Sequence, residues 1–211
     1  QKYTTLSSDP NIRNSKCDYY INSNESPIHI ANFNGVGGAT ILYSAQFPRL
    51  KESDFSVFSN DNVAKDWPLD YKTLLPYFEL NDKLTGLSGL AGDQMDKYVK
   101  PLMPPVPFGE MGRKLIGGFR KLDWHWWPAY SSLNTTEYRG RPVEDHSRPS
   151  NLAGGLNGSK GSVNNTYLPK ALGNGLTLMR NCRVTKLVKD SRLNSIEKIN
   201  YIDESGVEAS A

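Results

Sequence analysis

A glycine pair, Gly37 and Gly38, most restricts how this chain can fold; it lies in the stretch NGVGGAT at residues 34–40. Before it, PIHIANF alternates apolar and polar residues, which is typical of a short strand. After it, ATILYSAQF contains no helix breaker until Pro48, so we expect a short helix there. Glycines at a strand-to-helix junction allow backbone amides to face an anion such as a phosphate, and they equally suit a plain tight turn. Because no Gly-Lys-Ser/Thr sequence accompanies the pair, these residues alone leave both readings open.

The clearest helix is predicted at residues 70–86, DYKTLLPYFELNDKLTG. Asp70 is a suitable N-cap and Gly86 a suitable C-terminal stop. Leu74, Leu75, Phe78 and Leu84 mark its apolar face, and Pro76 falls in the first turns or kinks the helix.

The rest of the chain predicts shorter elements separated by loops rich in glycine and proline. Residues 110–122 predict a helix weakened by two adjacent glycines, and residues 165–175 predict a short helix that ends at Gly173 or Gly175. Residues 176–190 and 195–206 predict two or three strands with a turn near 190–194. The run GGLNGSKG at 154–161 resembles a phosphate loop only in composition.

Composition excludes several classes of protein. The net charge is +3 with no long basic run, which argues against a nucleic-acid-binding surface. Two cysteines and three widely spaced histidines argue against a metal site. There is no apolar run long enough to predict a transmembrane helix, and nothing assigns a cellular location. The sequence begins at Gln1 and stops at GVEASA, in a stretch that resembles the approach to a strand. We therefore expect an internal fragment of a longer protein.

The stretch DWHWWPAY at residues 123–130 gathers three tryptophans around His125. Aromatic packing is the simplest interpretation, and no motif supports a catalytic role for His125. Stacked aromatic rings also bind sugars, so a non-catalytic carbohydrate-binding module built on Trp124, Trp126 and Trp127 is an alternative function for the chain.

The order of several stretches resembles one known family. VGGAT.LYSAQFPR....DF is followed by DWPLDYKTLLPYFELNDKLTGLSG, PPVPFG, WHWWP, YRGRP, GSKGSVNNTYLPKAL and LTLMRNCRVTKLV. This series resembles the glucose–methanol–choline (GMC) oxidoreductases, in the branch similar to gluconate, sorbitol and fructose dehydrogenases. The resemblance is most specific at residues 36–40, 66–89 and 158–171.

The resemblance implies an α/β fold, with part of an FAD/NAD(P)-binding domain of the dinucleotide type and part of a substrate-binding α+β insertion. Residues 1–65 would belong to the FAD-binding domain, residues 66–160 to the helical and loop-rich insertion, and residues 161–211 again to the FAD-binding domain. It further implies an enzyme that oxidises the CH–OH group of a small alcohol, sugar or polyol by hydride transfer to FAD. A degenerate family member that keeps the fold without the chemistry is also possible, and the electron acceptor is not indicated.

The resemblance also implies where the cofactor lies. Gly37, Gly38 and Thr40 match the family's second glycine motif, and Asn34 and Tyr43 flank it. Val184 matches a strand residue whose backbone holds the adenine. The chain departs from the family pattern at Phe33, Ala39 and Tyr43, and it lacks the cysteines that serve an iron–sulfur cluster in some relatives. The first glycine box and the catalytic His with its His or Asn partner would lie outside this fragment, so no catalytic residue is assigned.

Overall fold

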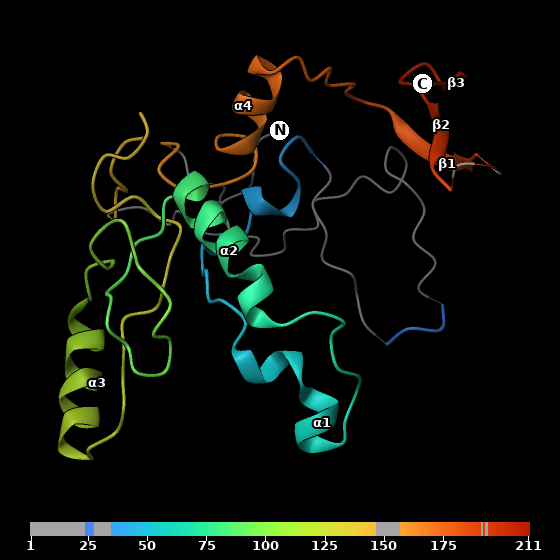
Figure 1. Cartoon of the computed structure of the whole chain (residues 1–211). Helices are drawn as coiled ribbons and strands as arrows, with labels where there is room; N and C mark the ends of the chain where they lie inside the picture. The colour runs from blue at the N-terminus through green and yellow to red at the C-terminus, as the bar shows by residue number, and fades with distance from the viewer. Residues whose placement is uncertain (1–23, 28–34, 147–156, 191, 193) are drawn as a thin grey trace. The chain divides into compact units, whose positions relative to one another are not determined.

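The computed structural model describes residues 24–27, 35–146, 157–190, 192 and 194–211 (Figure 1). These residues form two compact units, a larger one of 35–146 with 157–170 and a smaller one of 24–27 with the described part of 171–211. The domain boundaries predicted after residues 65 and 160 stay predictions. The elements, in chain order, are η1 (Gly38–Ile41), η2 (Glu52–Phe55), α1 (Val57–Asp61), α2 (Tyr71–Thr85), α3 (Glu110–Lys121), α4 (Tyr167–Gly173), β1 (Arg183–Lys189), β2 (Ile196–Ile202) and β3 (Glu208–Ser210).

The segment after the glycine pair is shorter and tighter than predicted. A helix was expected over residues 39–47, whereas the structure forms only the 3₁₀ turn η1, Gly38–Ile41. Ala45 has a left-handed backbone with φ of 59°, and Gln46 then pairs in extended conformation with Ser131. Tertiary pairing therefore replaces the local helix. The strand predicted in PIHIANF falls mostly on residues outside those described.

Helix α2 agrees with the prediction at both ends (Figure 1). The Asp70 carboxylate caps it by accepting from the Thr73 N–H at 2.8 Å, and Gly86 ends it with φ of 80°. Pro76 lies within the helix. Its buried residues are Tyr71, Asp82 and Thr85, whereas the four apolar residues predicted to mark its inner face are only half-buried.

The core of the larger unit is made by extended segments rather than by a sheet. Ser88 pairs with both Ser131 and Met103, and Leu133 pairs with Lys160. Leu87, Val99 and Tyr130 form the apolar cluster, with Phe47 and Trp127 packed against it. Polar side chains are buried beside this cluster, and they position the candidate site described below.

In the smaller unit, β1, β2 and β3 form an antiparallel sheet in that order. Strands are confirmed at 183–189 and 196–202, and Asp190 N–H donates to Ser195 O at 2.8 Å across the predicted turn between them. Residues 176–182, predicted as part of the first strand, form none, and β3 lies beyond the predicted range. α3 and α4 are also confirmed, with α4 ending at Gly173. Helices with a small antiparallel sheet are compatible with the predicted α/β class, while the dinucleotide-binding arrangement stays a prediction. No helix within the described ranges is long and apolar enough to cross a membrane.

Candidate functional site

Gly37 and Gly38 are both left-handed, with φ of 100° and 60°, but they are glycines for different reasons. A Cβ on Gly37 would lie 3.0 Å from the Cβ of Asn164 and 3.1 Å from the side chain of Ile41. A Cβ on Gly38 would meet no atom within 4 Å. A side chain at Gly37 would therefore be crowded as well as strained by the left-handed backbone, whereas a side chain at the half-buried Gly38 would enter open space.

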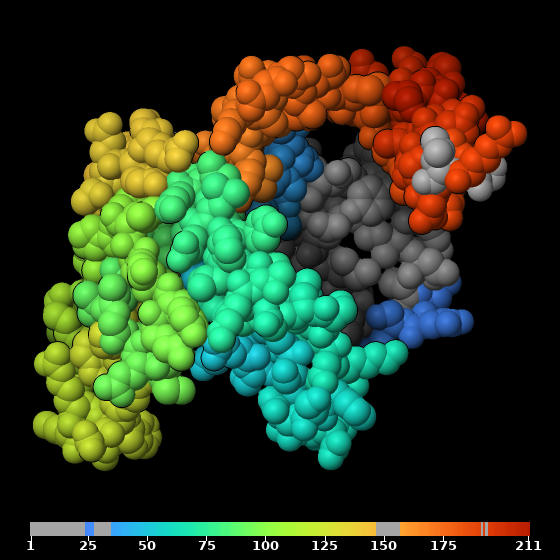
Figure 2. Space-filling view, viewed as in Figure 1, coloured from blue at the N-terminus to red at the C-terminus, as the bar shows by residue number. Residues whose placement is uncertain are grey.

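Segment 158–165 lies against residues 37–43, as Figure 2 shows where the orange surface meets the blue one. The Thr40 hydroxyl donates to Gly37 O at 2.6 Å and accepts from the Val163 N–H at 3.0 Å. The Tyr43 hydroxyl donates to Gly161 O at 2.5 Å. The hydroxyls of Thr40 and Tyr43, two residues predicted to belong to a cofactor site, thus join the two segments.

Lys160 is 2% exposed and lies under the glycine segment. Its Nζ donates to Ile41 O at 2.6 Å and to Tyr43 O at 3.0 Å, and it stands 5.4 Å from the centre of the Tyr43 ring. Burial lowers the pKa of Lys160 to about 8, with the Glu144 carboxylate opposing the shift. Burial also raises the pKa of Tyr43, which keeps its hydroxyl protonated as a donor at neutral pH.

Arg141 and Glu144 hold segment 158–165 from a second side. The Arg141 guanidinium donates to Ser159 O at 3.1 Å and to Thr85 O, and the Ser159 hydroxyl donates to Glu144. Burial lowers the pKa of Arg141, against the influence of Tyr43. Together with Lys160 these side chains form a buried polar cluster with two basic groups and one acidic group.

The remaining predicted cofactor residues, Asn34 and Val184, stay predictions. Asn34 lies outside the described residues. Val184 lies in the smaller unit, in β1 opposite Tyr201, where it is 57% exposed. The ladder shifts register between Val184 and Lys186, a bulge that interrupts the regular pairing of the backbone there.

The aromatic cluster has partners within the larger unit. Trp126 meets Phe108 edge-on at 6.2 Å, with Arg120 over its ring, and Trp127 donates to Leu90 O at 2.8 Å. Trp124 stacks on Phe119 but is 61% exposed. Trp126 and Trp127 are therefore half-buried and packed, as the aromatic-packing interpretation predicts, whereas Trp124 is largely exposed.

His125 pairs with an acid that the sequence did not connect to it. Its Nε2 lies 3.0 Å from Asp93 Oδ1, and its ring stacks on Trp127. The same Asp93 oxygen accepts from the Met95 N–H at 2.9 Å, so the carboxylate also fixes its own loop. Among the residues described, no three His, Cys, Asp or Glu side chains converge in a way that could hold a metal ion.

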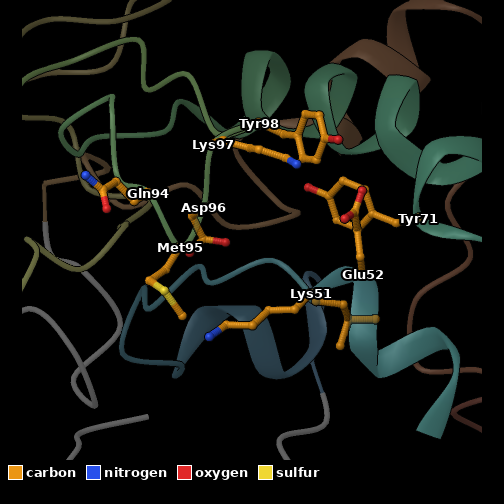
Figure 3. Close-up of a pocket in the computed structure, with 9 residues that line it drawn as sticks. Lys51, Glu52, Tyr71, Gln94, Met95, Asp96, Lys97 and Tyr98 are labelled. Atoms are coloured by element: carbon orange, nitrogen blue, oxygen red, sulfur yellow. The ribbon is translucent and has the colours of Figure 1, made fainter. Parts of the chain in front are cut away.

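A small pocket of about 150 Å³ lies elsewhere in the larger unit (Figure 3). Segments 50–52 and 94–98 line it together with Tyr71 of α2. Its charged side chains are of both signs, with Lys51 and Lys97 beside Glu52 and Asp96. None of the predicted cofactor residues contributes to this pocket.

No family model matches the chain. The chain is 33% identical over 183 residues to the 2-methyl-1,2-propanediol dehydrogenase of Mycolicibacterium austroafricanum, which covers 85% of this chain and 32% of that protein. It is 28% identical over 112 residues to the fructose dehydrogenase large subunit of Gluconobacter japonicus, which covers 51% of this chain and 21% of that protein. The chain thus spans about a third or less of the length of these relatives. Both relatives are named as dehydrogenases, so the similarity is to oxidoreductases.

Sequence reasoning missed the residues that support the glycine pair. Residues 158–171 are one of the stretches most similar to the family, but the sequence predicts no site residue among them. The structure shows that Lys160, Gly161, Val163 and Asn164 contact residues 37–43. The available signal was the run GGLNGSKG, whose small and basic residues were read for phosphate contact rather than for contact with the glycine pair.

Proposed function

We propose that this chain is the central part of an FAD-dependent GMC-type oxidoreductase, which oxidises the CH–OH group of an alcohol, sugar or polyol. The observation that carries the proposal is the glycine segment: Gly38 has open space at its Cβ position, and the buried Lys160 holds the backbone further along the same segment through the carbonyl oxygens of Ile41 and Tyr43. The similarity to two dehydrogenases supports the same reaction class.

The residues present fit a group of this kind. Gly35, Val36 and Ala39 are exposed in the same segment, and Gly38 is half-buried, so glycine and alanine supply most of the described side chains next to Gly38. Flat or phosphate-bearing groups approach a backbone closely where side chains are small or missing. Gly37 and Gly38 would hold the cofactor through their backbone, Thr40 and Tyr43 would fix that backbone, and Asn34 and Val184 are proposed as further contacts.

When bound, FAD supplies the acceptor for the hydride that leaves the carbinol carbon. The described residues would bind and orient the cofactor. The hydrogen bonds of Thr40, Tyr43 and Lys160 keep the glycine segment in one conformation. No residue of this chain is proposed as the base that takes the hydroxyl proton.

We propose a small polyol or sugar as the substrate, by analogy with the diol and the ketose in the names of the two relatives. Adding such a compound to the full-length protein without oxygen or another acceptor should bleach the visible flavin absorption. Bleaching by 2-methyl-1,2-propanediol or fructose, with none by a matched deoxy compound, would support the assignment. Flavin that stays oxidised with every diol and sugar, while a thiol or amine reduces it, would overturn it.

A substitution at Gly38 separates cofactor binding from folding. Asparagine tolerates a left-handed backbone, so Gly38→Asn should change the free energy of unfolding by less than about 1 kcal/mol. Its side chain would project into the open space, and we expect the affinity for FAD to fall about tenfold or more. The measurement is FAD binding by flavin fluorescence alongside urea unfolding.

Gly140→Asn is the matched control. Gly140 also has a left-handed backbone, with φ of 74°, and open space at its Cβ position. It lies in the turn between Tyr138 and Arg141, away from the glycine segment in the sequence. Equal FAD affinity for Gly38→Asn and Gly140→Asn would show that the face of Gly38 is not used.

A further inference from the structure

Lys160 connects two parts of the chain that are 119 residues apart in the sequence. Its ammonium donates to two carbonyl oxygens, those of Ile41 and Tyr43, which lie three and five residues after Gly38. Ile41 is the last residue of η1, and Tyr43 lies just beyond it. The carbonyl end of a helical turn carries partial negative charge, and a cation placed there stabilises it.

Burying this ammonium has a cost. Lys160 is among the largest fully buried side chains, and lysine is almost never fully buried unless it is paired. The lowered pKa of about 8 reflects that cost. An apolar side chain of similar length would fill the same space without the penalty. The retained ammonium therefore needs a reason beyond packing, and its two backbone contacts indicate one.

We propose that Lys160 is a positioning residue of the cofactor site, which fixes the backbone after the glycine pair and places a buried positive charge beneath it. This charge would favour an anionic group, such as a pyrophosphate, against the open face of Gly38. The inference rests on the proposed function, because it names the residue that prepares that site for its ligand.

Two variants of Lys160 and one control separate the contribution of its hydrogen bonds from that of its charge. Lys160→Met removes both the donor and the charge, whereas Lys160→Gln keeps an N–H donor without the charge. Lys170→Met is the matched control, since Lys170 is an exposed lysine in α4. At pH 7 we expect FAD to bind about tenfold or more weakly to Lys160→Met, as for loss of a hydrogen bond to a charged group. The FAD affinity of Lys160→Gln should lie between those of Lys160→Met and the wild type, and that of Lys170→Met should equal the wild-type affinity.

The pH profile tests the charge itself. Lys160 loses its proton on going from pH 7 to pH 9, because its pKa is about 8. FAD affinity of the wild type should therefore be higher at pH 7 than at pH 9, and both Lys160 variants should lack this decrease. Glu144, Arg141 and Tyr43 also face this region and remain in every variant, so a decrease that persists in Lys160→Gln belongs to them and overturns the charge role.

Hydrogen exchange tests the positioning without a cofactor. Peptides that cover residues 37–43 of the full-length protein should exchange faster in Lys160→Met than in the wild type or Lys170→Met. If the wild type binds FAD and Lys160→Met binds it equally well, the inference is overturned and the proposed function stands. If the wild type binds no flavin, the proposed function fails, and unchanged exchange at 37–43 would overturn the positioning as well.

Discussion

Replacing Gly161 with alanine is expected to reduce the free energy of unfolding of the larger unit by about 3 kcal/mol or more. A Cβ at this position would lie 2.2 Å from Ser132 Oγ and 2.5 Å from the backbone oxygen of Thr85. The serine could rotate away, but the carbonyl belongs to the end of α2 and is bonded by Arg141. The measurement is urea unfolding followed by tryptophan fluorescence, since all four tryptophans lie in the larger unit.

Gly118→Ala is the control for this substitution. Gly118 lies inside α3, and a Cβ there would meet nothing within 4 Å, so alanine should be neutral or slightly stabilising. Adding Ser132→Ala to Gly161→Ala should restore only part of the stability, because the Thr85 oxygen remains. Unfolding of Gly161→Ala at the wild-type urea concentration would contradict the close contact of segment 158–165 with the core.

Removing Arg49 is expected to destabilise the larger unit by about 3–5 kcal/mol at pH 7, because it leaves a buried carboxylate without its partner. Arg49 Nη2 lies 2.5 Å from Asp82 Oδ2, and both side chains are at most 5% exposed. Burial raises the pKa of Asp82, and the Arg49 guanidinium opposes that rise. The pKa of Arg49, which burial would lower, is raised because Asp82 and Tyr71 accept its hydrogen bonds.

The loss of unfolding free energy caused by Arg49→Met should depend on pH in one direction. Without Arg49 the folded-state pKa of Asp82 should rise further above its unfolded value, so the folded form takes up a proton more readily than the unfolded chain. The destabilisation measured against wild type should therefore shrink as the pH falls from 7 to about 5. The exposed pair Lys114–Glu110, at 3.0 Å, is the control: Lys114→Met should cost less than about 0.5 kcal/mol at either pH. If Arg49→Met and Lys114→Met lost the same unfolding free energy at both pH values, the result would contradict a buried Arg49–Asp82 ion pair.

Local signals predicted the helices and strands well because those signals act over a few residues. Asp70 and Gly86 mark α2 through a side-chain cap and a left-handed stop, both of which depend only on neighbouring backbone. The β1–β2 strands and their turn follow from alternation and turn residues in the same way. The helix expected after Gly38 was wrong because Gln46 pairs with Ser131, a contact between residues far apart in the sequence.

The support of the candidate site could not be predicted for the same reason. Thr40 and Tyr43 were chosen for their resemblance to cofactor contacts, yet their hydroxyls reach residues more than a hundred positions away. Lys160 gave no periodic or spacing signal, since its partners are backbone oxygens rather than side chains. Segment 158–165 was visible in the sequence as a block, but its contact with the glycine pair depends on the tertiary fold.

The measurement that tests the central claim most directly is the flavin content of the full-length protein. We predict that the purified protein is yellow and that denaturation releases FAD in a one-to-one ratio with the chain. A purified, folded protein that contains no flavin and takes up none when refolded with FAD would contradict the claim.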